Sequence, residues 1–146
     1  LLVGVGGGNH PGGTLADSIM VASFDAVQKT VSLLSVPRDL YVPISGHGKD
    51  KINAAHSFGE KEKKDNGPVL LKKTLENTLH VPIHAFVRID FDGFRQVVDA
   101  LGGVNINVTK AIVDPKYPGP LVVHTAILFL DGAVRVIPAG GSTSKR

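Results

Sequence analysis

The sequence has 146 residues and a formal net charge of +3, with 42% hydrophobic residues, 20% charged residues and no cysteine. A chain of this length can bury a hydrophobic core in one domain, and its composition excludes a disordered polypeptide. The lack of cysteine excludes a disulfide framework, a thiolate metal site and a cysteine nucleophile. The small basic excess is compatible with an anionic partner but does not identify one.

The first part of the chain is dominated by β-branched and apolar runs. Residues 6–13 form a glycine-rich loop, and Pro37 ends an extended segment because it donates no ladder hydrogen bond. Two of the runs are separated by residues 25–30, which favours a hairpin with a loop longer than two residues. Strands are therefore predicted at residues 1–5, 18–24, 31–36 and 41–44.

The middle of the chain alternates helical spacing with short strands. The charged run at residues 61–67 is interpreted as a solvated surface loop, and Gly102 and Gly103 end the last helix. Helices are predicted at residues 51–58, 68–79 and 91–101, and strands at residues 85–89 and 104–108. This order predicts an α/β sandwich with a mixed sheet. No run approaches the roughly 20 apolar residues of a membrane helix.

The glycine-rich loop is the first candidate site. A Walker loop is excluded because no Gly-Lys-Ser or Gly-Lys-Thr follows, and a dinucleotide fingerprint would need glycine in place of Asn9. A flexible connection between two strands remains an alternative. Because the loop carries Asn9 and His10 and leads to Asp17, it is also a candidate cradle for an anion and its metal ion.

The second candidate site follows the strand at residues 31–36. Arg38 stands at the exit of this strand, where its planar guanidinium could contact a phosphate with two hydrogen bonds. The alternative is a structural ion pair between Arg38 and Asp39. Lys49 and Lys51 add two cations to the next loop, and with Arg38 they could neutralise a pyrophosphate; Asn53 adds an amide.

Other catalytic patterns are missing from the sequence. The six histidines form no His-Glu-x-x-His motif, and no Gly-x-Ser-x-Gly elbow is present, which argues against a zinc hydrolase and a serine hydrolase. Asp90 and Asp92 stand at the start of a predicted helix, where capping explains them without chemistry.

Five segments in this order closely resemble the LytR-CpsA-Psr family of cell-wall transferases. Each segment alone has little specificity, but their combined spacing is distinctive, and the resemblance covers roughly the first four-fifths of the chain. The segments are Asp17-Ser18-Ile19-Met20, residues 33–42, Lys51-Ile52-Asn53-Ala54-Ala55, Asp90-Phe91-Asp92-Gly93-Phe94 and residues 98–104.

The resemblance implies an α/β/α three-layer sandwich with a mixed central sheet and a Mg²⁺-dependent phosphotransferase activity. Such an enzyme moves a glycopolymer from an undecaprenyl pyrophosphate carrier to peptidoglycan, at the outer face of the bacterial cytoplasmic membrane. The resemblance also implies a membrane anchor, which we expect upstream of residue 1, and no nucleic-acid partner. By the same resemblance, Asp17 holds the metal ion, Arg38 clamps the phosphates, and Lys51 and Asn53 lie near the head group.

Two regions depart from the family pattern. The first loop lacks the family's acidic residue and arginine, so His10 or backbone amides are candidates to substitute, and Leu15 stands where many members have arginine. After residue 132 the family's arginine-bearing helix is replaced by a segment with Pro138 and paired glycines. We therefore expect a catalytic domain over residues 1–132 and an irregular tail over residues 133–146, and we hypothesise that the tail is out of frame.

The incomplete clamp leaves two alternative functions open. One is a module that binds a polyprenyl pyrophosphate without transferring it. The other is a hydrolase that cleaves the carrier.

Overall fold

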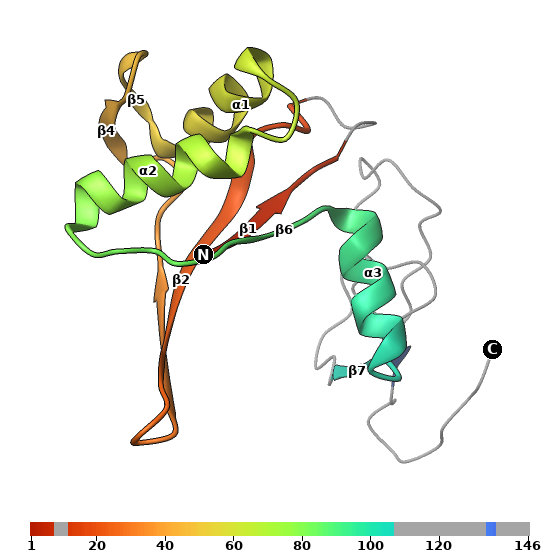
Figure 1. Cartoon of the computed structure of the whole chain (residues 1–146). Helices are drawn as coiled ribbons and strands as arrows, with labels where there is room; N and C mark the ends of the chain where they lie inside the picture. Colours follow the sequence, from red (N-terminus) through yellow and green to blue (C-terminus); the bar gives the residue numbers. More distant parts are fainter. Residues whose placement is uncertain (8–11, 107–133, 137–146) are drawn as a thin grey trace. The chain divides into compact units, whose positions relative to one another are not determined.

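The computed structural model describes residues 1–7, 12–106 and 134–136 (Figure 1). The chain divides into two compact units, Leu1–Asp92 and Gly93–Arg146. The division falls inside helix α3 (Phe91–Ala100), which follows the last strand of the first unit. All the candidate site residues lie in the first unit's range.

The first unit is built on a four-stranded sheet in the order β3-β2-β1-β6. β1 is antiparallel to β2 and parallel to β6, and β2 is antiparallel to β3, so the sheet is mixed, as predicted. In the turn of the β2–β3 hairpin, one oxygen of Asp25 accepts the backbone N–H groups of Val27 and Gln28. The strands are β1 (Leu2–Val5), β2 (Ala16–Asp25), β3 (Thr30–Ser35) and β6 (Val87–Ile89).

A second, two-stranded sheet and two helices complete this unit. The predicted strand at residues 41–44 is confirmed as β4 (Tyr41–Ile44), and it pairs with a strand that the sequence did not predict, β5 (Gly48–Lys51). Helices α1 (Ile52–Glu62) and α2 (Gly67–Leu79) follow and lie side by side (Figure 1). Lys61 and Glu62 end α1 and Gly67 begins α2, so the prediction that the charged run is a loop is wrong for its first two residues and its last.

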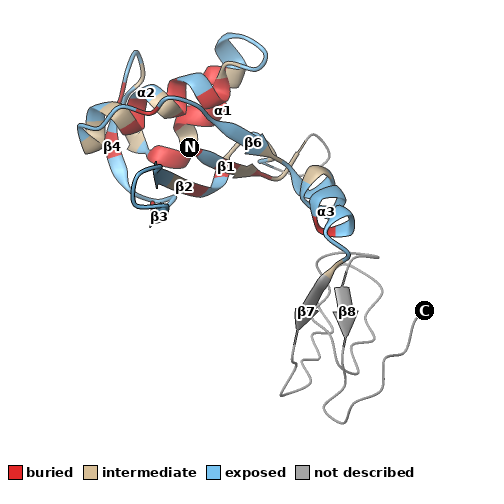
Figure 2. Ribbon diagram, turned by 60° about the horizontal axis from the view of Figure 1, so that its bottom comes forward, coloured by how far each residue is buried: buried red, intermediate tan, exposed pale blue. Residues whose placement is uncertain are grey.

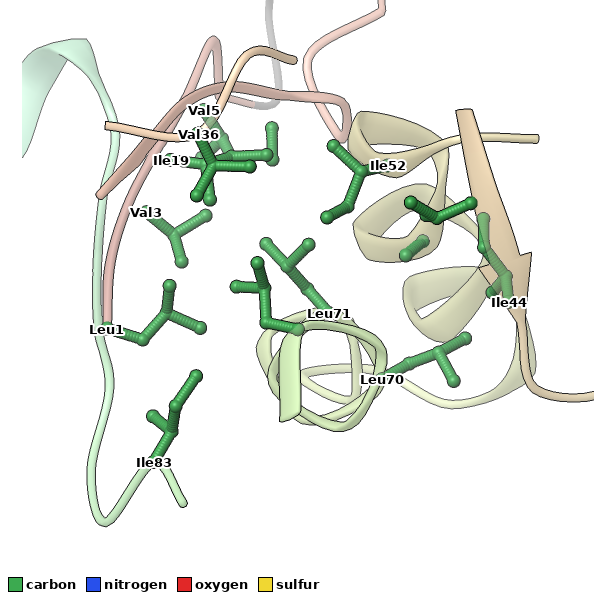
Figure 3. Packing of buried hydrophobic residues seen from close by; sticks show 14 residues of the cluster. Leu1, Val3, Val5, Ile19, Val36, Ile44, Ile52, Leu70, Leu71 and Ile83 are labelled. Atoms are coloured by element: carbon green, nitrogen blue, oxygen red, sulfur yellow. The ribbon is translucent and has the colours of Figure 1, made fainter. Parts of the chain in front are cut away.

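The hydrophobic core lies between the sheet and the two helices. Val3 and Ile19 project from the sheet toward Leu71 of α2, and Ile52 of α1 belongs to the same hydrophobic cluster (Figure 3). Side chains alternate between the two faces of a strand, so the neighbours of the core residues project from the opposite face. There Leu2, Phe24, Val31, Leu33 and Val87 remain exposed within the unit (Figure 2).

The second unit contains most of α3 and a parallel pair of short strands. β7 (Val104–Ile106) covers the first three residues of the strand predicted at residues 104–108. β8 (Val134–Val136) pairs with it. Three residues of the segment expected to be irregular are thus extended, and the rest of residues 133–146 lies outside the described part. Among the described helices, none has the length and apolarity needed to cross a bilayer.

The packing of the core predicts that substitutions at two nearby positions of α2 differ in their effect on stability. Leu71 is fully buried, whereas Val69 is 48% exposed. We expect Leu71→Ala to lower the free energy of unfolding by about 2–5 kcal/mol, because it removes buried contacts and leaves a cavity. Val69→Ala, the matched control, should change it by less than about 1 kcal/mol. Urea denaturation measures both, and equal effects would contradict this assignment of the core.

Candidate functional site

The candidate site lies at one edge of the four-stranded sheet. The parallel strands β1 and β6 both end at this edge and the antiparallel strand β2 begins there, while β3 runs toward it and stops at the level of Met20. Gly7 follows β1 with a φ of +86°, and a Cβ atom on it would lie 3.3 Å from the Cβ atom of Asp90, which follows β6. Ligands of open α/β sheets bind beyond the carboxyl ends of the strands, which is this edge.

Asp17 occupies an irregular position at the start of β2. Gly4 pairs with Ser18 and Val5 pairs with Ala16, so Asp17 is an extra residue in the ladder. Such a bulge redirects the side chain of the extra residue. A Cβ atom on Gly4 would lie 2.9 Å from the Cβ atom of Ser18, so this tight pairing next to the bulge requires glycine. The bulge therefore presents the Asp17 carboxylate at the edge of the sheet.

Four charged side chains alternate in sign across this edge. A guanidinium nitrogen of Arg38 donates to Asp17 at 2.7 Å, and the ammonium of Lys51 lies 2.7 Å from Asp39. The Nε atom of Arg38 lies 3.8 Å from Asp39, which links the two pairs. The closest partner of Arg38 is thus Asp17 and not the adjacent Asp39. All four side chains are 50–57% exposed, so a ligand from solvent can reach them.

Lys51 changes the acidity of Asp39. A hydrogen bond from Lys51 and its positive charge lower the pKa of the Asp39 carboxyl, and the charge of Arg38 adds to this effect. The Asp39 carboxyl therefore stays ionised to a lower pH than an ordinary aspartate does. The sequence placed Asp39 only as a partner of Arg38, and its pairing with Lys51 follows from the unpredicted strand β5.

The start of α1 is fixed to the loop that carries Arg38. The backbone N–H groups of Ile52 and Asn53 donate to the carbonyl groups of Leu40 and Arg38, at 2.8 and 3.2 Å. The N–H of Lys51 donates to the Asp50 carboxylate at 2.7 Å. These three donors are consequently engaged within the protein, and the exposed cationic side chains remain the groups best placed to bind an anion.

The other predicted binding residues are placed differently from one another. Lys49 lies on the exposed face of β5 that it shares with Lys51, because the two residues are two positions apart in one strand. Asn53 is only 7% exposed, so its side chain offers little surface to a ligand. Asn9 and His10 lie outside the described residues.

The described residues contain no cluster of three or more histidine or acidic side chains that could hold a metal ion. Mg²⁺ is commonly held by one or two carboxylates together with phosphate oxygens and water. Asp17 supplies one exposed carboxylate beside the cationic groups. The residues present therefore fit a magnesium ion that is shared with a bound phosphate better than one held by the protein alone.

His56 was not singled out by the sequence, yet it contacts the segment that precedes Asp17. It lies on α1 with 1% of its surface exposed, and its Nδ1 atom is 2.7 Å from the carbonyl oxygen of Thr14. Burial lowers the pKa of the imidazole. Its position four residues after the buried Ile52 is the one available signal, because that spacing places both residues on the inner face of the helix.

The model of the LytR_cpsA_psr family matches residues 1–136. The chain is 39% identical over 102 residues to the polyisoprenyl-teichoic acid–peptidoglycan teichoic acid transferase TagU of Oceanobacillus iheyensis, a match covering 70% of this chain and 32% of TagU. It is 42% identical over 101 residues to the regulatory protein MsrR of Staphylococcus aureus, a match covering 68% of this chain and 29% of MsrR.

A solved structure shares the fold. It is the LytR-CPS2A-psr family protein YwtF (TagT) with bound octaprenyl pyrophosphate lipid, which matches with a TM-score of 0.61 and 35% identity over 75% of this chain and 40% of that one. This match confirms the predicted fold class. The chain spans about a third of the length of the curated relatives that it matches.

The ion pair between Lys51 and Asp39 leads to a pH prediction. Because the pKa of Asp39 is lowered in the folded protein, the pair is formed above the ordinary value of 3.8 and is lost as the pH falls through the lower folded value. An NMR titration of the Asp39 carboxyl carbon should give a midpoint below 3.8, and Lys51→Met should raise it. Lys49→Met, the matched control, should leave the midpoint unchanged; an unchanged midpoint in Lys51→Met would refute the pairing.

Proposed function

The chain belongs to the LytR-CpsA-Psr family, and on this basis we propose that it binds a polyprenyl pyrophosphate carrier and transfers the attached glycopolymer to an acceptor hydroxyl. The observation that carries the proposal is the contact of Arg38 with Asp17 at the carboxyl edge of the sheet. It places a cation with bidentate capacity beside a carboxylate, and Lys51 adds a second cation next to them. The two cations suit a pyrophosphate, and the carboxylate suits a metal ion that such a phosphate shares.

The relatives support the substrate class. TagU is a teichoic acid transferase by name, and the YwtF (TagT) structure holds an octaprenyl pyrophosphate. The matched part of this chain is 39% identical in sequence to TagU and 35% identical to YwtF (TagT). We therefore assign a lipid-linked pyrophosphate to the edge that carries Arg38.

The reaction is a phosphoryl transfer. The acceptor oxygen forms a new bond to the phosphorus atom next to the glycopolymer, and the bond between this phosphorus and the bridging oxygen breaks. Polyprenyl phosphate leaves with that oxygen, and the acceptor proton passes to solvent. Negative charge grows on the departing phosphate, so Arg38 and Lys51 accelerate the step by holding cationic hydrogen-bond donors beside it.

Asp17 is the described residue that would hold Mg²⁺. The ion, when bound, neutralises phosphate charge and orients the phosphate oxygens. Asp17 itself fixes the position of Arg38 through the contact of 2.7 Å. The carboxylate thus orders the clamp before any ligand arrives.

The finer assignment follows the family resemblance. We propose undecaprenyl pyrophosphate as the carrier, peptidoglycan as the acceptor, and the outer face of the bacterial cytoplasmic membrane as the place of action, with the chain anchored there. The chain's lack of cysteine is compatible with an exported domain.

A single incubation separates transfer from the two alternative functions. The chain is mixed with a polyprenyl pyrophosphate-linked glycan, Mg²⁺ and peptidoglycan, and the products are separated by size. We expect glycan covalently attached to peptidoglycan, with release of polyprenyl phosphate. Glycan phosphate released into solution would instead identify a hydrolase, and binding without either product would identify a binding module.

Arg38 provides the test of the phosphate position. Arg38→Ala should weaken the binding of farnesyl pyrophosphate by about tenfold to a hundredfold, because it removes charge-assisted hydrogen bonds. Arg38→Lys should recover only part of this loss, since an ammonium lacks the planar pair of donors. Lys73→Ala, an exposed cation of α2, is the charge control and should leave binding unchanged. Isothermal titration calorimetry measures all three; unchanged binding in Arg38→Ala would refute the position.

A further inference from the structure

We propose that His56 is a positioning residue of the phosphate site: through Thr14 it holds the start of β2 so that Asp17 stays against Arg38. This inference rests on the proposed function, because it assigns the contact between Asp17 and Arg38 a role in binding. None of the five segments that carry the family resemblance includes His56.

Two side chains of α1 contact Thr14. The Nδ1 atom of His56 lies 2.7 Å from the Thr14 carbonyl oxygen, and the Ser57 hydroxyl lies 3.0 Å from the Thr14 hydroxyl. His56 and Ser57 are 1% and 8% exposed, so neither can shift without disturbing the core. The backbone and the side chain of Thr14 are thereby fixed together, three residues before Asp17.

The protonation of His56 follows from its contacts. A carbonyl oxygen only accepts hydrogen bonds, so Nδ1 must carry a proton and donate a hydrogen bond to the Thr14 carbonyl oxygen. In the neutral ring Nε2 is then an acceptor, and it is buried with no hydrogen-bond partner among the described residues. The charged groups that face the ring are Glu60, at 4.0 Å on the same helix, and Arg88 of β6. Burial, which lowers the pKa of the ring, favours this neutral form.

The orphaned nitrogen makes a purely space-filling role unfavourable. A buried acceptor without a partner destabilises the fold, whereas an apolar side chain of similar size at this position would not. The hydrogen bond to Thr14 is what a histidine adds here over leucine. We therefore explain the hydrogen bond between His56 and Thr14 by the segment that Thr14 holds in place.

The other half of the site is tied to the same helix. The N–H of Asn53, three residues before His56, donates to the carbonyl oxygen of Arg38. At the far end of α1, Glu60 accepts a hydrogen bond from Arg88 of β6 at 3.1 Å. Helix α1 thus fixes the Arg38 backbone on one side and the approach to Asp17 on the other. Loss of the His56 contact would loosen only the second of these, because the Ser57 hydroxyl still contacts the Thr14 side chain.

A double-mutant cycle tests the proposal, with farnesyl pyrophosphate and Mg²⁺ as the probe in calorimetry. We expect His56→Leu to weaken binding by about tenfold, in line with the loss of one buried hydrogen bond. His56→Asn should recover most of the affinity, because its amide nitrogen can occupy the place of Nδ1. In the Asp17→Asn background, His56→Leu should change binding by less than about twofold, since its effect passes through Asp17.

Thr74→Val is the control for general destabilisation. Thr74 is a 1% exposed residue of α2 whose hydroxyl donates to the Leu70 carbonyl, so its loss also removes a buried hydrogen bond, but away from Thr14. This variant should unfold at lower urea concentration and bind the probe as the unmodified chain does. The proposal is overturned if His56→Leu weakens binding equally in the Asp17→Asn background, or if His56→Asn binds no better than His56→Leu.

Amide hydrogen exchange keeps the inference separate from the proposed function. His56→Leu should speed exchange at residues 14–17 without ligand, and Thr74→Val should not. If the unmodified chain does not bind the probe, the proposed function fails, and faster exchange at residues 14–17 still supports the positioning role. Unchanged exchange there refutes it whatever the binding result.

Discussion

The site depends on two backbone hydrogen bonds that join the start of α1 to the loop after β3. Helices leave their first N–H groups without partners, and Lys51, which precedes the helix, provides no side-chain cap. The carbonyl groups of Leu40 and Arg38 accept these N–H groups instead. Since α1 also packs against α2 over the core, the loop with Arg38 is fixed to the most buried part of the unit. The backbone position of Arg38 is therefore set by its hydrogen bond to α1, and its side chain extends into solvent from this fixed point.

The sequence predicted those parts of the fold in which apolar periodicity is strong. The hairpin of β2 and β3, the helix after Pro68 and the parallel strand β6 all follow from such patterns. Strand β5 was missed because it reads Gly-Lys-Asp-Lys and has no apolar face of its own; its structure comes from pairing with β4. The extension of α1 past residue 58 was missed for a related reason. Glu60 is held there by the N–H of Gly67, beyond the end of the helix, and by Arg88, 28 residues further along the chain.

The sequence named residues of the candidate site, but it could not predict their arrangement. Asp17 and Arg38 were both identified from the sequence and the family resemblance, yet their contact depends on the bulge between β1 and β2. A bulge changes which side of the strand a residue faces, and periodicity alone cannot locate it. From the sequence, Asp39 was considered only as a partner of its neighbour Arg38. In the structure, strand β5 brings Lys51 closer to Asp39 than Arg38 is.

The alternating charges of the site suggest how ligand binding is controlled. Arg38 and Lys51 are each already paired with a carboxylate, but a guanidinium has five donors, so a pyrophosphate could bind Arg38 without breaking its contact with Asp17. The pairs are half exposed and individually weak, so their side chains can adjust to a ligand. Under the proposed function, a divalent cation on Asp17 and a phosphate on Arg38 would be neighbours of opposite charge. Metal and phosphate binding would then each favour the other, and the contact between Asp17 and Arg38 would keep the two sites adjacent.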